Sequence, residues 1–301
     1  MLRGIAVFSM QGRWQAAVTI ALLSSAALMI PLLSYLASGI IVLSTLRMGP
    51  KEGIKVLLAA MVIFIALAGF ILNELFIPLL FLLSAWLPVF AITLVLGYSR
   101  SLAVTFIIAA GLGLLLVTGF YLVEPDPALW WQEVLKPLTE TLSQQPGWTA
   151  EQAQKVMADL ASMMSGVLAA GVSMNLILGL LLGRSWQASL YNPGGFADEF
   201  QQLNLGKMPA ALTGLLFVIA VLPIGSEASY LRECLLVMLV VFSMQGIAVV
   251  HAIVRQQQRH KAWLITMYVL LLIMMPQMVA LLAMIGVLEQ WFNYRQRSIG
   301  Q

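Results

Sequence analysis

The sequence LFIPLLFLLSAWLPVFAITLVLGYSRSLAVTFIIAAGLGLLLVTGFYLV, residues 75–123, contains a single charged residue, Arg100. Arg100 divides this stretch into two uncharged segments, 75–99 and 101–123. An α-helix of roughly 20 apolar residues crosses the ~30 Å hydrocarbon core of a bilayer, and such a helix satisfies its own backbone polar groups. The stretch therefore predicts two membrane-spanning helices with a short connection at Arg100.

Uncharged segments of similar length recur along the whole chain. Of its 301 residues, 16 are basic and 13 are acidic, and these charges fall in short clusters. A soluble helical protein needs charged helix faces, which a composition of 61% hydrophobic and 10% charged residues does not supply. We therefore expect an all-α, polytopic transmembrane helix bundle of about 8–9 membrane segments, in contact with a lipid bilayer. The other uncharged segments are 14–46, 56–73, 160–183, 208–226, 234–254 and 262–288.

The composition also limits the class of protein. No segment outside the predicted spans exceeds about 40 residues, so we expect one integral membrane domain over residues 1–301. The net charge of +3 comes from basic residues at span ends, which suit lipid headgroups and give no reason to expect a nucleic-acid partner. The chain has one cysteine, two histidines and no recognisable catalytic or metal-binding motif. The sequence thus predicts a protein that is not an enzyme and that needs no cofactor or metal.

The first basic clusters set the expected orientation. Arg3 and Arg13 precede the first apolar segment, so we expect the N-terminus on the cytoplasmic side of the membrane. The next cluster begins at Arg47 and is expected on the same side. Segment 14–46 must then form two short helices broken near Pro31, or it is a single long tilted span.

An acidic segment, 124–159, is expected on the outer side and carries helix signals of its own. Asp126-Pro127 is a helix start, and apolar residues follow it at four-residue spacing. Thr149 and Gln152 fit a capping box that leads into the next apolar segment without a breaker. We therefore expect an outer helical insertion, followed by one long helix over about 150–183.

Segment 184–207 is expected in the cytoplasm. The turn signal Asn192-Pro193-Gly194-Gly195 precedes a short helix with Phe196 and Phe200 on one face. This helix rests at the membrane interface under the bundle, or its two phenylalanines dock a soluble partner. Continuing the count of spans places Arg295 and Arg297 outside, which violates the positive-inside rule.

Polar residues in or beside the spans are the candidate substrate-binding residues, because hydrocarbon disfavours them unless they pair or face water. For Asn175, which shares a ridge with Gly171, Gly179 and Gly183, the alternative role is close helix packing. Glu233, at the start of a span, is interpreted with its neighbours either as a headgroup-level cap or as a residue that lines a cavity. The candidates for substrate binding are Asn73, Glu74, Asn175, Gln245 and His251.

Three short motifs span most of the chain: Leu46-Arg47-Met48-Gly49-Pro50-Lys51-Glu52-Gly53, Asn192 to Phe196 with Glu199-Phe200, and Gln245 to His251. Together they resemble the YybS-like bacterial membrane proteins, a family of unknown function. The membrane core of that family is similar to the substrate-binding S components of energy-coupling-factor transporters. The resemblance implies small-molecule binding or transport. It also implies docking on a membrane coupling protein through the small residues Ala17, Ala21 and Ser25.

Two functions are therefore expected to compete. The first is small-molecule binding or transport, with a pocket open to the outer side near Glu74 and covered by segment 124–159. The second is a non-transporting scaffold of the envelope, which recruits a partner through Phe196 and Phe200 or through the outer helices.

Overall fold

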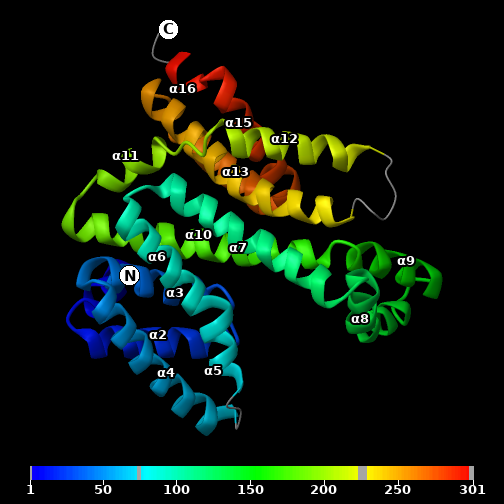
Figure 1. The fold of residues 1–301 in the computed structure, drawn as a ribbon, viewed down its shortest axis with the longest axis horizontal. Coiled ribbons are helices and arrows are strands. Elements are labelled where there is room, and N and C mark those ends of the chain that lie inside the picture. The colour runs from blue at the N-terminus through cyan, green and yellow to red at the C-terminus, as the bar shows by residue number, and fades with distance from the viewer. Residues whose placement is uncertain (1, 73–75, 223–228, 298–301) are drawn as a thin grey trace. The chain divides into compact units, whose positions relative to one another are not determined.

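The computed structural model describes residues 2–72, 76–222 and 229–297, and every regular element in these ranges is a helix (Figure 1). Asn73 and Glu74 lie outside the described residues. Within the described ranges, six helices are long and apolar enough to cross a membrane. These findings confirm the all-α class and fit a multi-pass membrane protein in contact with lipid. The six are Pro50–Phe70, Phe76–Ser99, Leu102–Val123, Met164–Tyr191, Ser229–Gln256 and Met275–Phe292.

The elements follow one another in this order: α1 Leu2–Ser9, α2 Arg13–Ala27, α3 Leu33–Met48, α4 Pro50–Leu72, α5 Phe76–Phe81, the π-helical turn η1 Leu82–Trp86, α6 Leu87–Ser99, α7 Leu102–Val123, α8 Pro127–Ser143, α9 Ala150–Ala161, α10 Met164–Tyr191, α11 Gly195–Gln201, α12 Lys207–Val221, α13 Ser229–Gln256, α14 Ala262–Ile273, α15 Met275–Phe292 and α16 Tyr294–Arg297.

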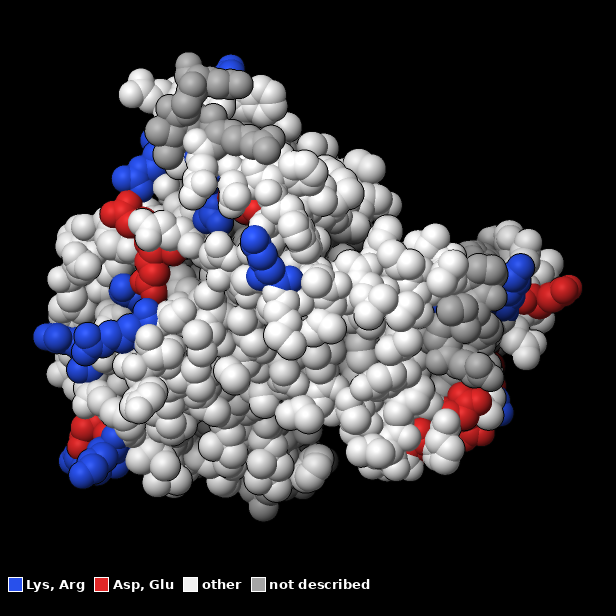
Figure 2. Space-filling model, turned by 45° about the horizontal axis from the view of Figure 1, so that its top comes forward, with Lys and Arg blue, Asp and Glu red and all other residues white. Residues whose placement is uncertain are grey.

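Charged side chains are sparse on the surface. On the face shown in Figure 2 they gather in a few patches, and wide uncharged areas lie between them. Large apolar side chains on the spanning helices are open instead, and Phe70 and Leu115 are 92% and 67% exposed. Exposed apolar area of this extent is typical of a surface that contacts lipid.

Contacts between residues divide the chain into two compact units. Unit 1 comprises Met1–Ala109 and Met174–Leu203, and unit 2 comprises Ala110–Ser173 and Asn204–Gln301. Helices α7 and α10 therefore contribute a part to each unit. The single-domain organisation expected from the sequence stays a prediction.

In unit 1, segment 14–46 forms two helices, α2 and α3, which confirms the two-helix alternative. The chain between them turns at Pro31, where Leu33 N–H donates to the Ile30 carbonyl and Ser34 N–H to that of Pro31. Proline has no N–H to donate to a helix, so the break falls at this residue. Helices α2, α3 and α4 pack against one another, and Trp86 Nε1 donates to Ser24 Oγ at 3.2 Å.

Glycines of α10 allow close packing within unit 1. A Cβ atom on Gly179 would lie 2.5 Å from Ser38 Cβ, and one on Gly183 would lie 2.5 Å from the Gly39 carbonyl oxygen. Such small residues let two helix backbones approach in a membrane. The packing role predicted for the glycine ridge is therefore confirmed at Gly179 and Gly183. Around Gly171 a Cβ would meet nothing within 4 Å.

In unit 2, α13 and α15 lie against each other in antiparallel directions. Gly246 touches the backbone of Leu282, whereas Gly286 touches the carbonyl of Phe242. Later residues of one helix thus meet earlier residues of the other. At both glycines the partner's backbone occupies the position of a side chain, so the two helices cross in direct backbone contact.

Two helices expected to be continuous are broken. The prediction of one helix over 150–183 was wrong, because α9 ends at Ala161 and α10 begins at Met164. Ser162 Oγ donates to the Asp159 carbonyl at 2.7 Å, which competes with the helical bond, and α9 folds against α8. Segment 262–288 is likewise divided at Met274, just before Pro276, which lacks an N–H and disfavours the preceding helical turn.

Replacing Gly246 with alanine tests the α13–α15 contact. The added methyl group has to displace the Leu282 backbone, so we expect Gly246→Ala to lower the free energy of unfolding by about 1–3 kcal/mol. The control is Gly111→Ala in α7, where a Cβ meets nothing within 4 Å and where alanine favours the helix. Thermal unfolding in detergent measures both. Equal melting temperatures for the two variants would contradict the close contact.

Candidate functional site

Gln245 serves as a structural cross-link. Its side chain is fully buried, Oε1 accepts from the Leu205 backbone N–H at 2.7 Å, and Nε2 donates to the Gly286 carbonyl. Gln245 therefore joins α13 both to α15 and to the segment that precedes α12. Because its amide oxygen and nitrogen are both bonded to the backbone, this residue has little capacity left for a substrate.

The other described candidates do not gather around Gln245. Asn175 belongs to unit 1, where its Nδ2 donates to Ser34 Oγ at 3.3 Å and its Oδ1 is buried without a hydrogen-bond partner. His251 belongs to unit 2, and its Nε2 lies 2.8 Å from the Tyr268 hydroxyl. The structure therefore places Asn175, Gln245 and His251 in three separate contacts.

The residues expected to dock a partner lie in unit 1. Ala17 and Ala21 are fully buried, and Ser25 Oγ donates to the Ala21 carbonyl at 2.9 Å. Phe196 and Phe200 lie on α11, the short helix expected after the Asn192 turn, and their rings stack with centroids 5.9 Å apart. The small-residue stripe thus packs inside unit 1, whereas both phenylalanines are half-buried.

A different polar residue, Glu233, is a buried acid with one carboxyl oxygen that lacks a hydrogen-bond partner. Glu233 begins the second turn of α13 and is 2% exposed. This burial favours the second interpretation, in which Glu233 faces the interior of the protein, over an exposed headgroup-level cap. This burial is possible because residue 166 of α10 is a glycine. A Cβ atom on Gly166 would lie only 2.7 Å from Glu233 Cα and Cβ.

Two kinds of donor face the Glu233 carboxyl group. The backbone N–H of Gly166 is one, and it belongs to the first turn of α10, where N–H groups have no partner within the helix. The hydroxyl of Tyr121 on α7 is the other. Both would stabilise a carboxylate, and neither brings a positive charge.

A second tyrosine fixes the position of the first. The rings of Tyr121 and Tyr230 meet edge to face with centroids 5.3 Å apart. Thr118 Oγ1 donates its only proton to the Leu114 carbonyl at 2.8 Å, so the 3.0 Å contact between Tyr230 and Thr118 has the tyrosine as donor. These bonds hold both rings in place beside Glu233.

One oxygen of the carboxyl group remains unsatisfied. Glu233 Oε2 is buried and has no hydrogen-bond partner, and no basic side chain pairs with this residue in the part of the chain that the structure describes. A charged group taken out of water without a counterion is strongly disfavoured. Glu233 is thus chemically suited to take up a proton or another cation.

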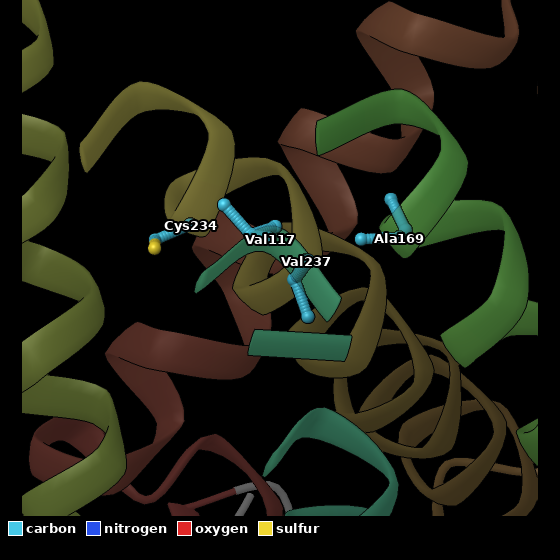
Figure 3. Packing of buried hydrophobic residues seen from close by; sticks show 5 residues of the cluster. Val117, Ala169, Cys234 and Val237 are labelled. Atoms are coloured by element: carbon cyan, nitrogen blue, oxygen red, sulfur yellow. The ribbon is translucent and has the colours of Figure 1, made fainter. Parts of the chain in front are cut away.

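Apolar and aromatic side chains exclude water from this carboxyl group. Figure 3 shows Val117 of α7, Ala169 of α10, and Cys234 and Val237 of α13 in one buried cluster. Cys234 is a free cysteine within it. On another side, Trp131 of α8 donates its Nε1–H to Ser165 Oγ at 2.8 Å, next to Gly166. Helix α8 therefore forms a cover over the start of α10.

Comparisons with protein-family models, with curated proteins and with solved structures find no match to this chain. The candidate site at Glu233 is therefore inferred from its geometry alone. Sequence reasoning missed it because its members lie far apart in the chain, at positions 118, 121, 166, 230 and 233. Only the acid at the start of an apolar run was visible beforehand, and a cap explains such an acid equally well.

Replacing Gln245 with leucine tests its structural role. We expect Gln245→Leu to lower the free energy of unfolding by about 1–3 kcal/mol, because the buried Leu205 N–H and Gly286 carbonyl lose their partner. Gln154→Leu on the exposed face of α9 is the matched control and should change stability little. Denaturant titration in micelles measures the difference. A stable Gln245→Leu protein would return this residue to the list of substrate contacts.

Proposed function

We propose that the protein is a small-molecule binding or transport protein of a bacterial inner membrane and that Glu233 is its proton-binding group. The supporting observation is a 2% exposed carboxyl group, in a helix long enough to span a membrane, with one oxygen lacking any partner. Ionisable groups inside membrane segments are costly, and they mark the proton and substrate pathways of transporters.

The proton is the cation that fits the site best. Glu233 packs on the backbone of Gly166 through its Cα, Cβ and Cγ atoms, and its carboxyl group has only neutral donors beside it. Larger cations also require several oxygen ligands, and no group of three or more metal-binding side chains occurs among the described residues. Among the described residues, Tyr121 bonds to Glu233, Cys234 follows it in the chain and Tyr230 packs on Tyr121, and none of these three side chains carries a positive charge.

The same geometry bears on the energy source. An S component docks on a coupling protein through exposed small residues, but Ala17 and Ala21 are both fully buried in unit 1. We therefore keep the small-molecule function implied by the resemblance. As the source of energy, we propose proton binding in place of a coupling protein. Segment 124–159, expected to cover an outer pocket, supplies Trp131 beside this site.

The proposed topology has about 8–9 membrane segments and a cytoplasmic N-terminus. In it, α13 runs inward and the antiparallel α15 runs outward, whereas α14, with 12 residues, spans only about 18 Å and does not cross. Arg295 is then outside, against the positive-inside rule. Its Nε donates to Glu289 Oε1 at 2.8 Å, and this ion pair neutralises one of the two charges that violate the rule, the other being that of Arg297.

Reporter fusions test this topology. With fusions at residues 50, 140 and 200, we expect an alkaline phosphatase reporter to be active only at 140, because that position lies in the acidic segment proposed to be outside. A reporter active in the cytoplasm should show the reverse pattern. Activity of the phosphatase at 50 or 200 would invert the orientation and place Glu233 near the cytoplasmic side.

Infrared spectroscopy tests the proton on Glu233. In reconstituted wild-type protein we expect a carbonyl stretch from a protonated carboxylic acid that disappears reversibly as the pH is raised. Glu233→Gln keeps the shape of the side chain and removes the titration, so this band should be absent. Glu140→Gln on the exposed face of α8 is the control and should keep it.

A thermal-shift screen of small metabolites connects the proton to ligand binding. The proposed function requires a compound that raises the melting temperature of the wild-type protein by an amount that depends on pH. The same compound should also stabilise the Glu233→Gln protein, but by an amount that does not change with pH. Persistence of the titrating band in Glu233→Gln would refute the proton site. Absence of any stabilising compound at any pH would refute the binding function.

A further inference from the structure

An apolar groove in unit 2 lies between α13, α14 and α15. Its volume is about 510 Å³, within the range of ligand-binding pockets. Val254 of α13, Met267 of α14 and Leu282 of α15 line its walls. Leu270 and Leu281, also in the lining, are 38% and 44% exposed, so the groove is open along one side.

The groove follows from the way α14 is attached. Helix α15 lies directly on α13 at Gly246 and Gly286, with no space between the backbones. Helix α14 is short and ends at the Met274 break, and the contact of His251 with Tyr268 holds it to α13 at 2.8 Å. A polar contact of two large side chains keeps α14 at a distance, and the groove is the space that remains.

Basic residues lie at one end of this groove. Arg255 lies in the last turn of α13, Arg259 and Lys261 lie in the connection to α14, and the sequence from 234 to 288 contains no acidic residue. Arg259 itself lines the groove beside Gln257 and Trp263. One of its five N–H donors, on Nε, bonds to Gln257 Oε1 at 3.3 Å. The end of the groove therefore carries the positive charge of Arg259, and its walls are apolar.

We propose that this groove binds one acyl chain of an anionic phospholipid, whose phosphate pairs with Arg259. The walls suit a hydrocarbon chain, and the excess of positive charge suits an anionic headgroup over a zwitterionic one. Guanidinium groups bind phosphate through paired hydrogen bonds. Trp263, 63% exposed at the same end, is of the type enriched at the level of the headgroups. The site lies apart from Glu233 and does not depend on the function proposed for it.

Native mass spectrometry of the whole chain in detergent tests the proposal. We expect phosphatidylglycerol to bind more tightly than phosphatidylcholine with the same acyl chains. Arg259→Gln should weaken the binding of phosphatidylglycerol about fivefold and that of phosphatidylcholine little. Lys51→Gln, which removes one charge from an exposed basic residue that does not line this groove, should leave both affinities unchanged.

A second variant tests the acyl chain. Leu281→Trp places a larger ring in the open side of the groove and should weaken both lipids together, while inorganic phosphate should not compete with phosphatidylglycerol. Equal loss of binding in Arg259→Gln and Lys51→Gln would show general charge attraction and overturn the site. Full competition by inorganic phosphate, or unchanged binding to Leu281→Trp, would overturn the role of the groove.

Discussion

The backbone contact between α13 and α15 is the interaction on which unit 2 depends. Gly246 and Gly286 bring the two helices together without intervening side chains, and Gln245 bonds across the same crossing. Of the most apolar 18-residue window of α13, 78% is buried, against 50% or less in the other five spans. In hydrocarbon, apolar side chains gain little by leaving lipid, so close packing and buried hydrogen bonds decide how helices associate. Glu233 and the basic groove occupy opposite ends of this central helix.

The class of fold was predictable because it depends on the distribution of charge, which the sequence states directly. The break at Pro31 and the helix starts at Asp126 and Thr149 were also predictable, since each is a local backbone effect, and the caps at both starts are present. The breaks at Ser162 and Met274 were not. The bond from Ser162 Oγ to the Asp159 carbonyl does not by itself end a helix, since Ser243 makes the same bond to Val240 within α13, and the packing of α9 against α8 is not encoded locally.

The partners within the membrane were the least predictable part. In a soluble helix, an apolar stripe marks the buried face, but a spanning helix is apolar on its lipid-facing side as well. The sequence therefore showed Gln245 as a polar residue in a span without showing that both ends of its amide bond to the backbone. It showed Gly171, Gly179 and Gly183 as equivalent, although only the latter two meet a neighbouring helix.

Two buried glutamates of unit 2 show how structural and functional acids differ. Glu289 is 3% exposed, and it accepts from Arg295 at 2.8 Å and from the Tyr294 backbone N–H at 2.7 Å, so its charge is compensated where α15 ends. Glu233 is 2% exposed and has only neutral donors and one unpartnered oxygen. Replacing Glu233 by an apolar residue would remove an unfavourable burial, whereas replacing Glu289 would strand an arginine. Folding therefore accounts for Glu289, whereas the burial of Glu233 disfavours folding, as expected for the proton-binding group that we propose.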